Sequence, residues 1–129
     1  IEVTNYPDLI KGCAAIADRR SMKGTKTIVN SLKTAITVSS IQTLLKNDER
    51  LIYFFFSSKG PVPRLDSGRL LEEARSLPRD EELQIRAAID IWCGEGGTHL
   101  SDLLHDWDND NWTAFIDSIA ILNGMPREP

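Results

Sequence analysis

The sequence predicts an all-α protein, a compact bundle of about seven or eight short helices. Apolar residues recur at three- and four-residue spacing along most of the chain, which is the pattern of an amphipathic helix. Serine, threonine, aspartate, glycine and proline separate these stretches, as helix caps and stops do. Only residues 51–57 also fit a short strand, which would make the fold α+β.

Size and composition favour one globular domain over residues 1–129. The chain has 129 residues, of which 41% are apolar and 26% charged, and its mean hydropathy is -0.25. Its longest uninterrupted apolar run, Leu51 to Phe56, is far shorter than the roughly 18 residues of a membrane span. Two cysteines are too few for a disulfide-rich secreted domain. We therefore expect a cytoplasmic protein without a membrane segment.

The first third of the chain predicts three helices, with apolar residues at helical spacing between positions 9 and 45. Pro7 stands at a suitable first helical position, and Gly24 provides a stop. The next two helices each follow hydroxyl residues that can cap free backbone amides. These expected caps are Thr25 or Thr27 for the second helix and Ser39 or Ser40 for the third.

Residues 51–56, Leu-Ile-Tyr-Phe-Phe-Phe, form the ambiguous stretch. Their composition favours a buried strand, but four of the six side chains also fit one face of a helix. We predict a helix, because a single strand would leave its backbone groups unpaired. A glycine and two prolines then predict a loop at 57–65 between the two halves of the chain.

The second half predicts a helix that begins at Asp66 or Ser67 and another that begins after Pro78. The latter has three acidic residues in its first turn, which suits the positive end of the helix dipole. It carries two apolar rows, so we expect it to be the central helix, with Trp92 buried. Its rows are Leu83, Ala87 and Ile91, and Ile85, Ile89 and Trp92, and it ends at Gly94, Gly96 and Gly97.

Each of the last two predicted helices has one apolar stripe. The first stripe repeats at i, i+3, i+4 and i+7. The second follows a cap at Asp110 or Asn111 and stops at Gly124. The two stripes consist of Leu100, Leu103, Leu104 and Trp107, and of Trp112, Phe115, Ile116 and Ile119.

Charge is divided unevenly along the chain, although the net charge is only -4. Residues 1–64 hold ten basic and five acidic residues, a net charge of +5. Residues 65–129 hold five basic and fourteen acidic residues, a net charge of -9. Such a division is expected when one half faces an anionic partner, or when the halves attract each other within one fold or across a homo-oligomer. We favour the mutual attraction of the two halves.

Within the basic half, four cations gather around the expected junction of the first two helices, and Lys33 lies two turns further along the second. Cations beside the free amides of a helix start favour an anion there. No aromatic residues are interleaved with them, which argues against stacking on single-stranded nucleic acid. We predict that this basic cluster contacts a protein partner with an acidic surface, and nucleic acid is the alternative. The cluster consists of Arg19, Arg20, Lys23, Lys26 and Lys33.

Two patterns in the acidic half have some features of metal sites, and we predict no metal at either. Residues 106–117 alternate oxygen-bearing side chains as a calcium loop does, but Asn111 replaces the turn glycine and Asp117 the bidentate glutamate. A turn between helices, rich in capping residues, explains this segment better. A solvated helix face explains the second pattern. That pattern consists of His99, Asp102 and Asp106.

We predict no catalytic residue and no cofactor. Cys13 and Cys93 fall in apolar stripes, where a thiol usually packs and does not react. The segment from Gly24 to Thr27 lacks the earlier glycine and the strand of a phosphate-binding loop. The glycines after Cys93 follow a helix, so they do not form a dinucleotide-binding motif.

We expect a non-enzymatic interaction or regulatory module, an adaptor that binds a protein partner. One alternative is a nucleic-acid-associated accessory protein that uses the basic half, and another is a small metal-dependent or catalytic module that uses the acidic half. An exposed apolar patch would favour the adaptor. A contiguous positive face would favour nucleic acid, and a concave pocket with converging polar groups would favour an enzyme.

Overall fold

The computed structural model describes residues 22–125, with side chains from residue 30 onward. Within this range the chain forms six α-helices and no β-strand, which confirms the all-α prediction with fewer helices than expected. The first expected helix, opened at Pro7, lies outside the described residues. The helices are α2 (Met22–Leu44), α3 (Glu49–Phe55), α4 (Ser67–Ala74), α5 (Arg79–Cys93), α6 (Leu100–Asp106) and α7 (Asn109–Leu122).

Helix α2 is continuous where the sequence predicted a boundary at Ser39 or Ser40. That boundary is wrong because the Ser40 hydroxyl donates to the Ser118 carbonyl oxygen of α7, at 2.9 Å, and does not cap a new helix. Thr37 similarly donates to the carbonyl oxygen of Lys33, four residues earlier, at 2.8 Å. Hydroxyl residues are therefore satisfied inside the helix and leave it unbroken.

The stop expected at Gly24 and the caps expected at Thr25 or Thr27 are also wrong, because all three residues lie within α2. Glycine keeps its backbone N–H, so inside a helix it costs about 1 kcal/mol relative to alanine but leaves the hydrogen-bond pattern intact.

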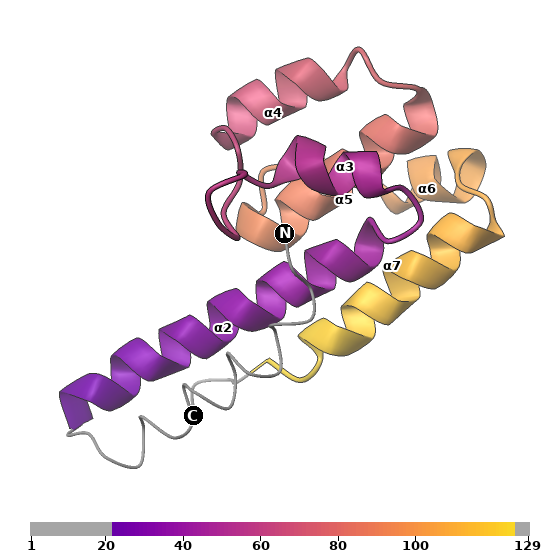
Figure 1. The fold of residues 1–129 in the computed structure, drawn as a ribbon. Coiled ribbons are helices and arrows are strands. Elements are labelled where there is room, and N and C mark those ends of the chain that lie inside the picture. The colour runs from indigo at the N-terminus through magenta and orange to yellow at the C-terminus, as the bar shows by residue number, and fades with distance from the viewer. Residues whose placement is uncertain (1–21, 126–129) are drawn as a thin grey trace.

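Helices α2 and α7 lie side by side and run in opposite directions (Figure 1). The Lys46 ammonium just after α2 contacts the Asp117 carboxylate on α7 at 2.8 Å, and Asn47 donates to the carbonyl oxygen of Asp110 at 3.0 Å. These contacts and the buried hydrogen bond from Ser40 fix the register of the two helices.

The ambiguous stretch is helical, as predicted, and forms most of α3. Asp48 caps this helix by accepting a hydrogen bond from the Arg50 amide at 3.0 Å. The alternative strand at 51–57 is not formed, and a single antiparallel bridge between Phe56 and Pro63 is all that remains of it. The loop predicted at 57–65 falls within the connection from α3 to α4.

Helix α5 is the central helix, as expected, since α2, α3, α4 and α6 all contact it. Leu83, Ile85 and Ile89 are fully buried in the core that these helices share. Trp92 was predicted to be buried but is only half-buried, because it lies in the last turn of α5, where the helix reaches the protein surface. Of the helices in residues 22–125, none has the length and apolar character needed to cross a lipid bilayer.

Candidate functional site

Three aromatic rings meet at the corner between α6 and α7. The Trp107 ring lies 5.8 Å from the Trp112 ring and 5.6 Å from the Phe115 ring, both in edge-to-face geometry. The Trp107 indole N–H donates to the carbonyl oxygen of Asp80 at the start of α5, at 3.1 Å. Trp107 is buried, whereas Trp112 and Phe115 are half-buried, so the cluster reaches the surface.

Large apolar side chains on both α6 and α7 are exposed. Both helical stripes predicted from the sequence are only partly covered, because Leu103 is 1% exposed while Leu104, the next residue, is 71% exposed. On α7, Ile116 lies one turn after Trp112 and is 61% exposed. We call the exposed and half-buried apolar side chains of these two helices the α6–α7 apolar surface. It consists of Leu100, Leu104, Trp112, Phe115, Ile116 and Ile119.

The chain around this surface is acidic. Residues 99–125 contain five aspartates and no lysine or arginine. Arg79 of α5 lies 3.6 Å from Asp102 and 3.4 Å from Asp106, and so partly neutralises one side of α6. Hydrogen bonds from His105 and Arg79 hold the pKa of the Asp106 carboxyl below its ordinary value of 3.8.

The capping interpretation of residues 106–117 is supported. Helix α7 begins at Asn109, so most of the candidate calcium loop is helical. The cap is Asp108, which accepts from the Asn111 amide at 2.9 Å, and not Asp110 or Asn111 as predicted. Asp106 pairs with Arg79, and His99 is the residue before α6. Among the described residues, no group of His, Cys, Asp or Glu side chains has a metal-binding arrangement.

The predicted basic cluster is described only in part. Lys23, Lys26 and Lys33 all lie on α2, while Arg19 and Arg20 lie outside the described residues. The turn expected between Lys23 and Lys26 is absent because α2 is continuous there. The lysine positions therefore follow one helix and do not surround a corner.

The opposite charges of the two halves attract each other inside the fold. Beyond the Lys46 to Asp117 contact, Arg50 lies 3.2 Å from Glu81, and Arg64 lies 3.1 Å from Glu73. Each pair joins a cation of the first half to a carboxylate of the second half. Mutual attraction within one fold, which the sequence analysis favoured, thus accounts for part of the charge division.

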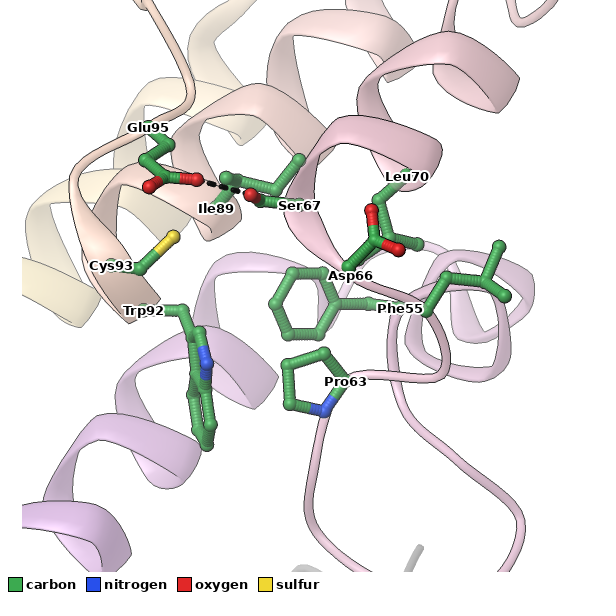
Figure 2. A pocket seen from close by; sticks show the side chains of 10 residues that line it. Phe55, Pro63, Asp66, Ser67, Leu70, Ile89, Trp92, Cys93 and Glu95 are labelled. Atoms are coloured by element: carbon green, nitrogen blue, oxygen red, sulfur yellow. Dashed lines mark hydrogen bonds between the residues drawn. The ribbon is translucent and has the colours of Figure 1, made fainter.

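A pocket of about 230 Å³ opens at the other end of α5 (Figure 2). The Trp92 ring stands on one side of it, and Pro63 and Phe55 stand on the other. The buried side chains of Phe55, Leu70 and Ile89 form its apolar walls. Segments from α3, the loop before α4, α4 and the end of α5 therefore build the pocket together.

The polar groups of the pocket lie along its rim. The Ser67 hydroxyl donates to the Glu95 carboxylate, and Asp66 caps α4 by accepting from the Arg69 amide at 2.9 Å. Cys93 also lines the pocket and is exposed, so the prediction that it packs in an apolar stripe is wrong. It is the last residue of α5, where helical spacing no longer points toward the core. Cys13 lies outside the described residues.

Comparison with protein-family models, curated proteins and solved structures finds no match to this chain. The function is therefore inferred from the geometry of its own residues.

Sequence reasoning missed both the exposure of the α6–α7 apolar surface and the pocket. A signal for the first was present, since α6 has only seven residues but belongs to a stripe with four large apolar side chains. One neighbouring helix rarely covers so wide a stripe on so short a helix. No sequence pattern points to the pocket, because its walls come from segments far apart in the chain.

Proposed function

We propose that this protein is a non-enzymatic interaction module that binds a protein partner through the α6–α7 apolar surface. The observation that carries the proposal is the exposure of Leu104 on α6 and of Ile116 on α7, one turn after the half-buried Trp112. Clustered exposed apolar side chains mark interaction sites on soluble proteins, and aromatic residues dominate binding energy at interface centres.

The charge near this surface indicates the chemistry of the partner. Asp108 and Asp110 at the start of α7 make no ion pair with any described residue. Carboxylates at the rim of an apolar surface favour a partner that places lysine or arginine side chains opposite them. The partner that fits is a protein surface with an apolar centre and a basic rim.

The basic cluster remains a separate prediction. It would contact an acidic protein surface, so one partner could engage both regions only if its own charge were divided in the same way. Nucleic acid remains the alternative occupant of the cluster. Neither possibility is required for binding at the α6–α7 apolar surface.

A pull-down with matched variants tests the proposal. The double variant Leu104→Ser, Ile116→Ser removes two exposed apolar side chains and should leave the unfolding free energy nearly unchanged. The control double variant Tyr53→Ser, Val62→Ser removes exposed apolar side chains from α3 and the following loop. We expect a protein that binds the wild type and the control variant to be lost with the α6–α7 variant.

Two further measurements separate the alternatives. Sedimentation velocity of the purified protein shows whether the partner is a second copy of this chain. A gel-shift series with Arg20→Glu, Lys23→Glu shows whether nucleic acid binds the basic cluster. The proposal is wrong if every captured protein binds the α6–α7 variant as well as the wild type.

A further inference from the structure

We propose that the pocket at the C-terminal end of α5 binds a small organic cation, an ammonium group carried on an aromatic or short aliphatic body. This pocket lies at the opposite end of α5 from the corner at Trp107, and the proposal does not rest on the proposed function. It follows from the size of the pocket, the charge of its rim, its aromatic walls and the way its rim is held.

The volume and the walls fit a compact apolar body. The pocket measures about 230 Å³, and an apolar cavity of roughly 150 Å³ is known to hold a benzene ring. Phe55, Leu70 and Ile89 lie beneath the pocket, and the half-buried side chains of Trp92, Pro63 and Leu65 supply the apolar surface that a ligand can reach. A single ring or a short alkyl chain can therefore lose its contact with water here.

Charge on the rim favours a cation. Asp66 and Glu95 are the charged residues among those that line the pocket. Trp92 and Cys93 are the last residues of α5, so the pocket also faces the negative end of the dipole of a 15-residue helix. The nearby guanidinium of Arg64 is engaged elsewhere, by the carbonyl oxygen of Phe54 at 3.0 Å and by Glu73.

Aromatic rings on two sides add to this preference. The Trp92 ring faces Phe55 and Pro63 across the hollow (Figure 2). The negative face of an indole ring attracts a cation, and this attraction grows as the cation loses water. A cation between Trp92 and the rim carboxylates would thus contact a ring and a negative charge at once.

The rim is held in place by the chain that follows α5. Asp90 accepts from the amide of Gly96 at 2.7 Å and from the amide of Thr98 at 3.0 Å, which closes the loop back onto the helix. Glu95 stands in this loop and accepts from Ser67 at the start of α4. Because these bonds exist without a ligand, binding needs little additional ordering of the rim.

A titration at pH 7 with 2-phenylethylammonium and with 2-phenylethanol, its neutral counterpart of similar size, tests the proposal. The readout is the indole N–H signal of Trp92 in proton–nitrogen NMR spectra, identified by its loss in Trp92→Phe. We expect the cation to bind about tenfold more tightly than the alcohol, since the rim carboxylates and the ring act on the charge alone.

Matched variants show whether the two rim carboxylates contribute to binding of the cation. Glu95→Gln preserves an acceptor for Ser67, and Asp66→Asn preserves the cap of α4, so both should remain folded. We expect each to weaken binding of the cation and not of the alcohol. Glu72→Gln removes an exposed carboxylate of α4 that does not line the pocket, and it should change neither affinity.

The same ammonium chemistry could come from a free amine or from a lysine side chain of a protein. Butylammonium and Nα-acetyl-lysine methylamide distinguish these sources, because only the second carries the peptide groups of a protein. Tighter binding of the lysine derivative assigns the pocket to a lysine side chain, and tighter binding of butylammonium assigns it to a free amine. Equal binding of 2-phenylethylammonium and the alcohol, or no shift of the Trp92 signal, would overturn the proposal.

Discussion

Helices α5 and α7 carry similar apolar stripes, but the structure covers them to different extents. On α5, Ile85 and Ile89 are buried because four other helices pack around that helix. On α7, Ile116 and Ile119 are exposed, since α2 is the described helix that packs extensively along it and lies on its other side. Helical spacing therefore identifies an apolar face, and the number of neighbouring helices decides whether that face is covered.

The largest expected difference in stability is between alanine substitutions of two adjacent leucines on α6. Leu103 is buried in the core shared with α5, so Leu103→Ala should lower the unfolding free energy by about 2 to 5 kcal/mol. Leu104 is exposed, so Leu104→Ala should change it by less than about 0.5 kcal/mol. Urea denaturation of both variants measures the difference. Equal losses would mean that the α6–α7 apolar surface is part of the core.

The next effect concerns the loop that closes the end of α5. A Cβ atom at Gly96 would collide with the Arg86 carbonyl oxygen and crowd the Asp90 carboxylate. Gly96→Ala should therefore cost about 2 kcal/mol, because the loop must move and lose hydrogen bonds to Asp90. Gly60→Ala is the control, since nothing lies within 4 Å of its Cβ position. Similar denaturation midpoints for the two variants would show that the loop is not held by Asp90.

A smaller effect distinguishes two buried glutamines. The Gln84 amide on α5 donates to the Asn111 side chain on α7, whereas the Gln42 amide nitrogen on α2 has no hydrogen-bond partner among residues 22–125. Gln84→Met should lower the unfolding free energy by about 1 to 2 kcal/mol, because Asn111 loses its donor. Gln42→Met should be neutral or stabilising, since it removes an unsatisfied donor. Calorimetric melting of both variants checks the sign, and a loss for Gln42→Met would contradict the account.

The smallest expected effect is on the pH dependence of folding stability, through Asp106 of α6 and its contact with Arg79 at the start of α5. Because folding lowers the pKa of Asp106 below 3.8, its contribution to stability is present above that pH and is lost as the pH falls through the folded-state value. Asp106→Asn should therefore be slightly less stable than the wild type at about pH 6, and the difference should disappear in acid. Denaturation curves recorded between about pH 6 and pH 2 measure it. If the stability difference between the wild type and Asp106→Asn grew as the pH fell, folding could not lower the pKa of Asp106.

The positions of most helices could be predicted from the sequence, because caps, stops and apolar spacing within a few residues determine where a helix begins and ends. Pro78 precedes α5, and Gly94 ends that helix with a backbone φ of 79°, a conformation that favours glycine. The helix over residues 51–56 was predicted because no partner strand was available. These features depend on a few neighbouring residues, so one sequence contains enough information.

The remaining features depend on contacts between distant segments. Ser40 resembles a helix cap in sequence and becomes an interior residue of α2 because Ser118 accepts its hydrogen bond. Trp92 and Phe55 are separated along the chain and face each other only in the folded protein. The exposure of Leu104 likewise depends on which helices lie beside α6. None of these outcomes follows from periodicity or capping preference alone.

The heat-capacity change on binding the captured partner tests the central claim most directly. Burial of apolar surface makes this change negative, independently of the signs of enthalpy and entropy. We expect a negative value for the wild type in titration calorimetry at several temperatures, and a less negative value for Leu104→Ser, Ile116→Ser. The same negative value for the wild type and this variant would contradict the assignment of the α6–α7 apolar surface as the binding site.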